Sequence, residues 1–246
     1  MQTEKPIIIA HRGAKGMAPE NTLGAFRLGV EQGCEAIELD VHLSADGEII
    51  VCHDETLDRT TNGKGMICEK TLAEIKSLDA GSWHSEAYRG ETVPTLGEVF
   101  DAVPGSLMIN VEVKQSYDGN MDRKLVQFLR ERDLFDRVVV SSFDHQCLHR
   151  IKVLEPKTKI GLLYQLRLYN PAAYAKTFGV DVYSLHPYHR LIDREEVEQA
   201  IRAGLHMYPY TANEEQDLKA LIDWGVSGII TDYPGRLKDL LALGGV

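Results

Sequence analysis

Short apolar runs alternate with longer amphipathic segments along most of the chain. The first pair consists of PIIIA, at residues 6–10, followed by NTLGAFRLGVEQG, at residues 21–33. Short runs of branched apolar residues are typical of buried strands, whereas apolar residues spaced three and four apart are typical of helices that pack on one face. Seven further pairs repeat this order, so the pattern predicts eight strand–helix units.

This alternation predicts an α/β fold. A strand, a helix and a second strand in succession form a parallel pair with a helical crossover. Eight such units in 246 residues match the usual size of a closed (β/α)8 TIM barrel, which we expect to form one domain over residues 1–246. An open doubly wound sheet is the alternative, but no G-x-G-x-x-G motif follows the first predicted strand.

One segment, at about residues 54–94, interrupts the alternation after the second strand region. It is far longer than the few residues usual for a loop between a strand and a helix. It carries a short helical pattern of its own, TLAEIKSLD at residues 71–79, and several glycine turns. We interpret it as an insertion that lies over the carboxyl end of the barrel and shapes a substrate pocket.

Composition narrows the possible partners and location. The formal net charge of -10 argues against general nucleic-acid binding, and it means that an anionic substrate needs local cations. The four cysteines form no C-x-x-C pair, so a reducing cytoplasm is the simplest setting. No stretch reaches about 18 uncharged apolar residues, so we expect neither secretion nor membrane insertion. The oligomeric state is left open.

Polar residues occur at every second position of the predicted strand AIELDVHL. Glu38, Asp40 and His42 therefore share one face of this strand. Glu112 and Lys114 share a face of the next unit's strand in the same way. In a TIM barrel, polar residues near the carboxyl ends of strands point into the common mouth, where active sites lie. The alternation thus indicates a site rather than a strand with one wet side.

Glu38, Asp40 and Glu112 predict a metal site. Carboxylate oxygens suit one hard divalent cation, Ca²⁺ or Mg²⁺, and the group lacks the thiolates that soft metals prefer. Buried without a partner, these charges would be very costly, and a cation would relieve that cost. The alternative is ion pairing with Arg12 and Lys114 and no metal.

His11 and His53 follow two different predicted strands and flank the carboxylates. Two imidazoles that titrate near neutral pH can serve as base and acid across one bond. The planar fork of Arg12 suits two phosphate oxygens, and Lys114 offers a point charge to the same group. Either cation can instead simply neutralise Glu38 or Glu112, and spacing alone does not decide between these interpretations.

Several motifs follow one another along the chain: HRG, PENTLGAF, EAIELDVHLSADGEIIVCHDETLDRTTNG, PTLGEVF, VEVK, SSFD and GVSGIITDYP. Together they resemble the glycerophosphodiester phosphodiesterase family from about residue 7 to about residue 241. The resemblance implies a barrel with an inserted segment, a divalent metal, and hydrolysis of small glycerophosphodiesters to sn-glycerol 3-phosphate and an alcohol. It implies these roles: acid–base catalysis for His11 and His53, metal binding for Glu38, Asp40 and Glu112, and phosphate contact for Arg12 and Lys114.

Three positions near these motifs bear on substrate contact and local structure. Many family members have Trp-Thr-Val-Asn where this chain has YTAN, so Tyr210 stands at the tryptophan position and is expected to contact the substrate. A smaller aromatic wall with a hydroxyl would alter headgroup preference. Asn21, in the P-E-N-T motif, is predicted to cap the following helix. Asp232 ends the last predicted strand, where it touches either the site or only the adjacent loops.

Two other functions are alternatives to hydrolysis. A noncatalytic phosphate or lipid-headgroup binding module would not require both histidines together with all three candidate ligands. A phospholipase-D-like lyase that acts on lipids would be expected to carry a signal peptide or an amphipathic membrane segment, and the sequence shows neither. We therefore predict a metal-dependent phosphoric diester hydrolase.

Overall fold

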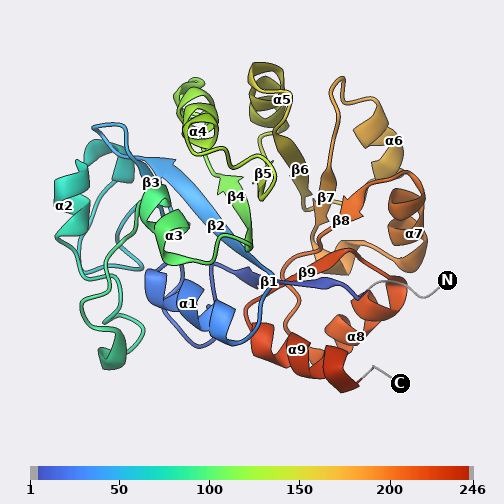
Figure 1. Cartoon of the computed structure of the whole chain (residues 1–246), viewed down its shortest axis with the longest axis horizontal. Coiled ribbons are helices and arrows are strands. Elements are labelled where there is room, and N and C mark those ends of the chain that lie inside the picture. The colour runs from blue at the N-terminus through green and yellow to red at the C-terminus, as the bar shows by residue number, and fades with distance from the viewer. Residues whose placement is uncertain (1–4, 244–246) are drawn as a thin grey trace.

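The computed structural model describes residues 5–243 and contains the predicted barrel (Figure 1). Eight strands pair in parallel, and each is followed by a helix, which confirms the (β/α)8 prediction. The parallel strands are β1 (Ile7–His11), β2 (Ala36–Leu43), β4 (Met108–Val113), β5 (Val138–Ser142), β6 (Lys159–Tyr164), β7 (Ser184–Pro187), β8 (His206–Met207) and β9 (Gly228–Thr231).

The strands follow one another around the barrel in chain order, from β1 through β2 and β4 to β8, with β9 beside β1. The last gap, between β8 and β9, is bridged by backbone hydrogen bonds outside the regular ladder. The N–H of Ser227 donates to the carbonyl of Met207 at 3.1 Å, and the N–H of Ile230 donates to the carbonyl of Pro209 at 3.0 Å. The sheet is therefore nearly closed, and all strand carboxyl ends meet at one mouth.

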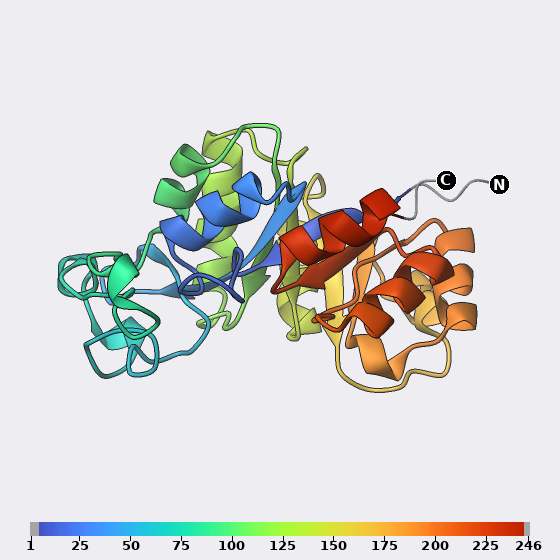
Figure 2. The same ribbon diagram turned by 90° about the horizontal axis from the view of Figure 1, so that it is seen from below.

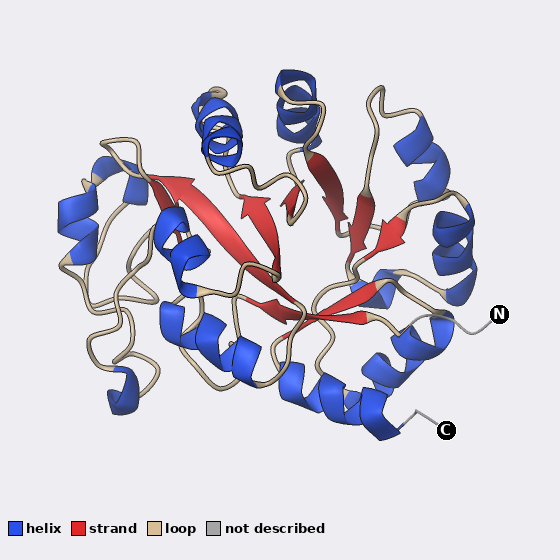
Figure 3. Cartoon of the chain, viewed as in Figure 1, coloured by secondary structure: helices blue, strands red, loops and turns tan. Residues whose placement is uncertain are grey.

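Helices surround the strands (Figure 3). None of those within residues 5–243 is long and apolar enough to cross a membrane. They are α1 (Leu23–Glu31), α2 (Leu72–Lys76), α3 (Leu96–Ala102), α4 (Asn120–Glu131), α5 (His145–Leu154), α6 (Pro171–Lys176), α7 (Arg194–Arg202), α8 (Glu215–Trp224) and α9 (Pro234–Leu243).

The cap of α1 differs from the prediction. Thr22 caps this helix, because its hydroxyl oxygen accepts from the N–H of Ala25 at 3.2 Å. Asn21 has a left-handed backbone (φ 56°), and its side chain turns away from the helix to donate to Asp40 at 2.9 Å. The prediction that Asn21 caps the helix is therefore wrong: the next residue is the cap, and Asn21 serves the barrel mouth.

Strand β2 shows how the core positions the site. All eight of its residues are buried. Ile37, Leu39 and Val41 belong to the main apolar cluster, which extends between the strands and the surrounding helices. Because side chains alternate along a strand, Glu38 and Asp40 point to the opposite face, into the barrel. The apolar face thus holds the strand in a register that presents the polar face to the mouth.

The insertion packs around its own small core. Strand β3 (Ile49–Val51) pairs antiparallel with the end of β2, and the chain then forms the 3₁₀ turns η1 (Ile67–Glu69) and η2 (Glu86–Tyr88) on either side of α2. The segment projects from one side of the barrel beyond β2 (Figure 2). Its buried residues form a cluster distinct from the main one: Ile50, Cys52, Leu57, Ile67, Ile75, Ala80 and Val93.

Candidate active site

Three carboxylates from two neighbouring strands meet at the mouth. Glu38 and Asp40 lie on β2 and Glu112 on β4, and the backbone register places Asp40 directly beside Glu112. One oxygen of each side chain lies within 4.8 Å of the others. Glu38 and Asp40 are buried, with 3% and 0% of their surface exposed. We refer to these residues as the acidic trio.

The acidic trio has unused ligand capacity. Oε1 of Glu38 and Oδ1 of Asp40 accept no hydrogen bond from residues 5–243, although both atoms are buried. Burial and the neighbouring charge of Asp40 raise the pKa of Glu38 and raise that of Glu112 to about 7. Orphaned carboxylate oxygens held this close together are the donor set of a hard divalent cation, so the residues present fit Ca²⁺ or Mg²⁺.

Two cations already pair with the acidic trio. Nε of Arg12 lies 3.2 Å from Asp40, and Nζ of Lys114 lies 2.7 Å from Glu112 and 3.5 Å from Asp40. Burial would raise the pKa of Asp40, but these two cations outweigh burial and lower it. The ion pairs of the alternative interpretation therefore exist, but within residues 5–243 no hydrogen bond reaches Oε1 of Glu38 or Oδ1 of Asp40.

The charges around the mouth do not balance. Six carboxylates belong to this network, against four basic side chains, so a divalent cation would bring the group close to neutrality. The acidic members are Glu20, Glu38, Asp40, Asp54, Glu112 and Asp232, and the basic members are Arg12, Lys15, Arg59 and Lys114.

His11 ends β1 and is held from the neighbouring strand, β9. Its Nδ1 lies 2.6 Å from Oδ1 of Asp232, which follows β9. Its Nε2 lies 3.9 Å from Glu38. Because a carboxylate only accepts, Nδ1 carries the proton and the neutral ring presents the lone pair of Nε2 to the trio. Asn213 fixes Asp232 through a 2.8 Å side-chain hydrogen bond.

His53 is held in the same way by a residue that the sequence reasoning missed. Its Nδ1 lies 2.7 Å from Oδ1 of Asp54, and Arg59 in turn donates to Asp54 from Nε at 2.7 Å and from Nη2 at 3.0 Å. Burial lowers the pKa of both His11 and His53. The two imidazoles therefore share one arrangement: a carboxylate on Nδ1 and a free Nε2. Asp54 and Arg59 lie in the HDETLDRTT motif, and their closeness to His53 in that motif is the sequence signal that could have found them.

Glu20 links Arg12, the residue after His11, to Arg59, which holds the Asp54 partner of His53. It accepts from Nη1 of Arg12 at 2.8 Å and from both terminal nitrogens of Arg59 at 2.8 and 2.9 Å. Burial would raise its pKa, but the hydrogen bonds and charges of these arginines lower it to about 2. Glu20 thus stays ionised and fixes both guanidinium planes.

Tyr210 lies on the opposite side of the mouth, in the loop after β8. Burial raises its pKa, and the charge of Glu112 adds to the shift. Its hydroxyl donates to the carbonyl of Tyr164 at 3.2 Å, and its ring meets Phe143 edge to face with centroids 6.1 Å apart. Phe143 is 49% exposed. The two rings form an aromatic side to an otherwise charged mouth.

Comparison with known proteins agrees with this geometry. The sequence model of the glycerophosphoryl diester phosphodiesterase family matches residues 11–236. The chain belongs to this family. The match extends from the first of the two histidines to α9, and thus includes every residue of the acidic trio. Family membership confirms the resemblance predicted from the motifs and shows that the protein is an enzyme.

Relatives of this phosphodiesterase family match over nearly their whole length. A glycerophosphodiester phosphodiesterase from Caldanaerobacter subterraneus subsp. tengcongensis is 42% identical, covering 98% of this chain and 100% of its own. One from Bacillus subtilis is 35% identical, covering 95% and 86%. Among solved structures, a phosphodiesterase from Oleispira antarctica in complex with the product sn-glycerol-3-phosphate superposes with a TM-score of 0.88 at 31% identity, covering 97% of each chain.

Proposed function

We propose that this phosphodiesterase hydrolyses small glycerophosphodiesters to sn-glycerol 3-phosphate and an alcohol, with one divalent cation and two histidines. One observation carries the proposal. Two imidazoles, each held by a carboxylate on Nδ1, lie beside three carboxylates, two of which have orphaned oxygens. The product complex of the Oleispira antarctica relative supports the substrate class.

The acidic trio would hold the cation. A bound Ca²⁺ or Mg²⁺ supplies charge neutralisation for the phosphodiester and polarises its oxygens. Arg12 and Lys114 lie on the same carboxylates and extend this positive field. In our proposal their remaining N–H groups bind phosphate oxygens, while Glu20 and Glu112 keep their side chains in place.

His11 and His53 would move the protons. In the neutral tautomer set by its carboxylate, each ring accepts a proton at Nε2, and the Nδ1 carboxylate then stabilises the imidazolium. One ring removes the proton of the attacking oxygen while the other, protonated at Nε2, donates to the leaving oxygen. The environments of the two rings are so alike that acid and base can exchange roles between successive steps.

The aromatic side of the mouth would accept the organic part of the substrate. Tyr210 and Phe143 present apolar surface near Glu112, which suits a glycerol or headgroup carbon chain. We place the enzyme in the cytoplasm, because its four cysteines are free thiols and a reducing compartment keeps them so.

An assay on a panel of glycerophosphodiesters tests the proposal. Release of sn-glycerol 3-phosphate should require Mg²⁺ or Ca²⁺ and should stop in chelator-treated protein. Binding of the panel without turnover, under any metal, would instead support a noncatalytic module. A cyclic phosphate as the only final product would support the lyase.

A further inference from the structure

The third polar residue on the inner face of β2 takes no part in the chemistry proposed above. His42 is buried, with 2% of its surface exposed, and both ring nitrogens are engaged. Its Nε2 lies 3.2 Å from the backbone carbonyl oxygen of His53, and its Nδ1 lies 2.9 Å from the hydroxyl of Tyr117. A carbonyl oxygen only accepts, so Nε2 carries the proton and the Tyr117 hydroxyl donates to Nδ1.

Tyr117 reaches His42 from a strained turn between β4 and α4. Tyr117, Asp118 and Gly119 all have left-handed backbones, with φ of 50°, 54° and 80°. Non-glycine residues in this region are strained, and they persist only where surrounding contacts determine the conformation.

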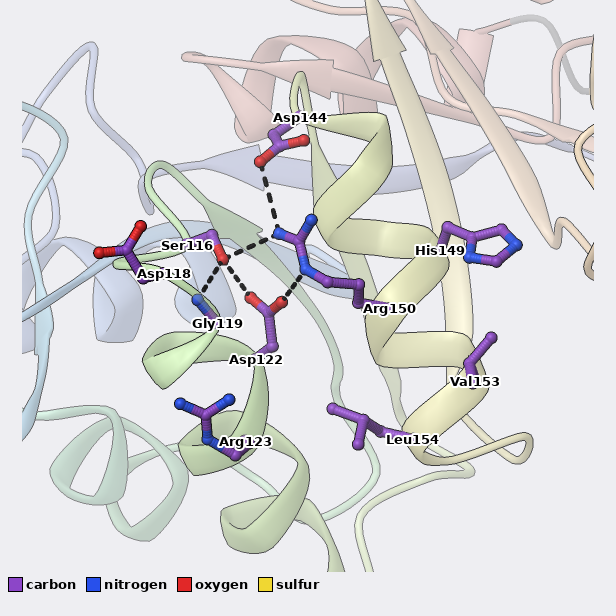
Figure 4. Close-up of a pocket in the computed structure, with 10 residues that line it drawn as sticks. All are labelled: Ser116, Asp118, Gly119, Asp122, Arg123, Asp144, His149, Arg150, Val153 and Leu154. Atoms are coloured by element: carbon purple, nitrogen blue, oxygen red, sulfur yellow. Dashed lines mark hydrogen bonds and ion pairs between the residues drawn. The ribbon is translucent and has the colours of Figure 1, made fainter.

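A clamp of side chains between α4 and α5 provides those contacts (Figure 4). Ser116 accepts from the N–H of Gly119 at 3.0 Å and donates to Asp122 at 2.8 Å. Arg150, on α5, donates to Asp122 at 2.7 Å and to Ser116 at 2.9 Å. These side chains line a cleft of about 760 Å³, but they satisfy one another, so the cleft's polar groups hold the turn.

We propose that His42 is a positioning residue for His53. The clamp fixes the turn, the turn fixes Tyr117, and Tyr117 and His42 together fix the backbone carbonyl of His53. His53 needs this support because it leaves β3 at the start of the insertion, whereas His11 ends a regular barrel strand. Asp54 sets the ring of His53, and His42 sets the main chain that carries it. The inference rests on the catalytic role proposed for His53.

Kinetic variants of the full-length enzyme test the inference. His42→Leu keeps bulk but removes the N–H, and it should lower kcat about 10-fold or more with KM changed less than about twofold, since small misplacements of a catalytic group are costly. His42→Gln keeps a donor toward the carbonyl and should recover most of kcat. The matched control is His206→Leu, at the opposite end of the barrel, which should keep wild-type kcat. Equal kcat in His42→Leu and wild type, or no recovery in His42→Gln, would overturn the inference.

Two further measurements separate positioning from general damage. Calorimetric Mg²⁺ affinity should be unchanged in His42→Leu, because the acidic trio keeps its contacts; a loss of affinity parallel to kcat would show disruption of β2. Nitrogen-15 NMR of the histidine rings at pH 8 should show His42 protonated at Nε2, and His11 and His53 at Nδ1. Finding His42 protonated at Nδ1 refutes the positioning role of His42 even if the protein proves inactive on glycerophosphodiesters. An inactive wild type with the expected tautomers would refute the proposed function alone.

Discussion

Nδ1 of His11 lies 2.6 Å from Oδ1 of Asp232, although 221 positions separate them in the chain. The barrel makes this contact because β9, which precedes Asp232, pairs with β1, which ends at His11. The carboxylate selects the ring tautomer that leaves the Nε2 lone pair on the side of the acidic trio.

Asp232→Asn should therefore lower kcat about 100-fold or more, because an amide can donate to Nδ1 and so place the ring proton on Nε2. The fold should survive, since the side chain keeps its shape. Steady-state kinetics and ring nitrogen NMR check both statements. Asp223→Asn, at an exposed position of α8, is the matched control. A variant with normal kcat would remove Asp232 from the mechanism.

Metal binding is tested at the third member of the acidic trio. Glu112→Gln removes charge but keeps volume, so it should weaken Mg²⁺ or Ca²⁺ binding about 10-fold or more while unfolding near the wild-type temperature. Calorimetric titration and thermal unfolding measure the two effects. Glu131→Gln, on the exposed surface of α4, should change neither. Full turnover by protein shown to be metal-free would contradict the role of the trio.

Glu20 predicts a pH-dependent contribution to stability. Its pKa is lowered from 4.5 to about 2, so the stabilisation is present above about pH 4.5 and is lost as the pH falls toward 2. Glu20→Gln should lower the free energy of unfolding at pH 7 by up to about 3 kcal/mol, and the difference from wild type should narrow in acid. Urea unfolding at pH 7, 4.5 and 3.5 gives the comparison, with exposed Glu198→Gln as the control. A difference that does not vary with pH would exclude this linkage.

The insertion has a separate apolar cluster, so its removal should not unfold the barrel. Replacing residues 60–90 with a short linker should leave the barrel's circular dichroism intact, lower the melting temperature, and change the ranking of glycerophosphodiesters by kcat/KM. The ranking is expected to change because the replacement removes Tyr88, whose hydroxyl donates to the carbonyl of Met17 in the loop that follows His11. Global unfolding of the shortened chain would show that the segment is part of the barrel's stability.

Because the environments of the two imidazoles are alike, we expect the glycerol's own adjacent hydroxyl to attack phosphorus first. This attack gives a cyclic phosphate, which water opens in a second step. An aligned internal hydroxyl supplies an effective molarity of about 10⁵ M or more. A substrate analogue without that hydroxyl should bind normally but resist cleavage. Product release is measured alongside binding competition with the natural substrate. Cleavage of the analogue at the normal rate would favour direct attack by water.

Much of this structure follows from local pattern. Eight strand–helix units were predictable because each leaves its own periodicity, and Glu38 and Asp40 were predictable because strand alternation places them on one inward face. Asp54 and Arg59 were not assigned roles, because loop geometry decides which carboxylate meets which ring nitrogen. Similarly, Asn21 and Thr22 are both good helix caps. Only the left-handed backbone that turns Asn21 toward Asp40 decides between them.

The two imidazoles belong to parts of the molecule with separate apolar cores. His11 ends a barrel strand, whereas His53 is flanked by Cys52 and Leu57 of the insertion's cluster. Partial opening of that cluster would carry one imidazole away while the barrel stays folded, so heat should inactivate the enzyme before it melts. Each part contains one of the chain's two tryptophans, Trp83 in the insertion and Trp224 at the end of α8. Loss of turnover should therefore coincide with the fluorescence change of Trp83 and precede that of Trp224.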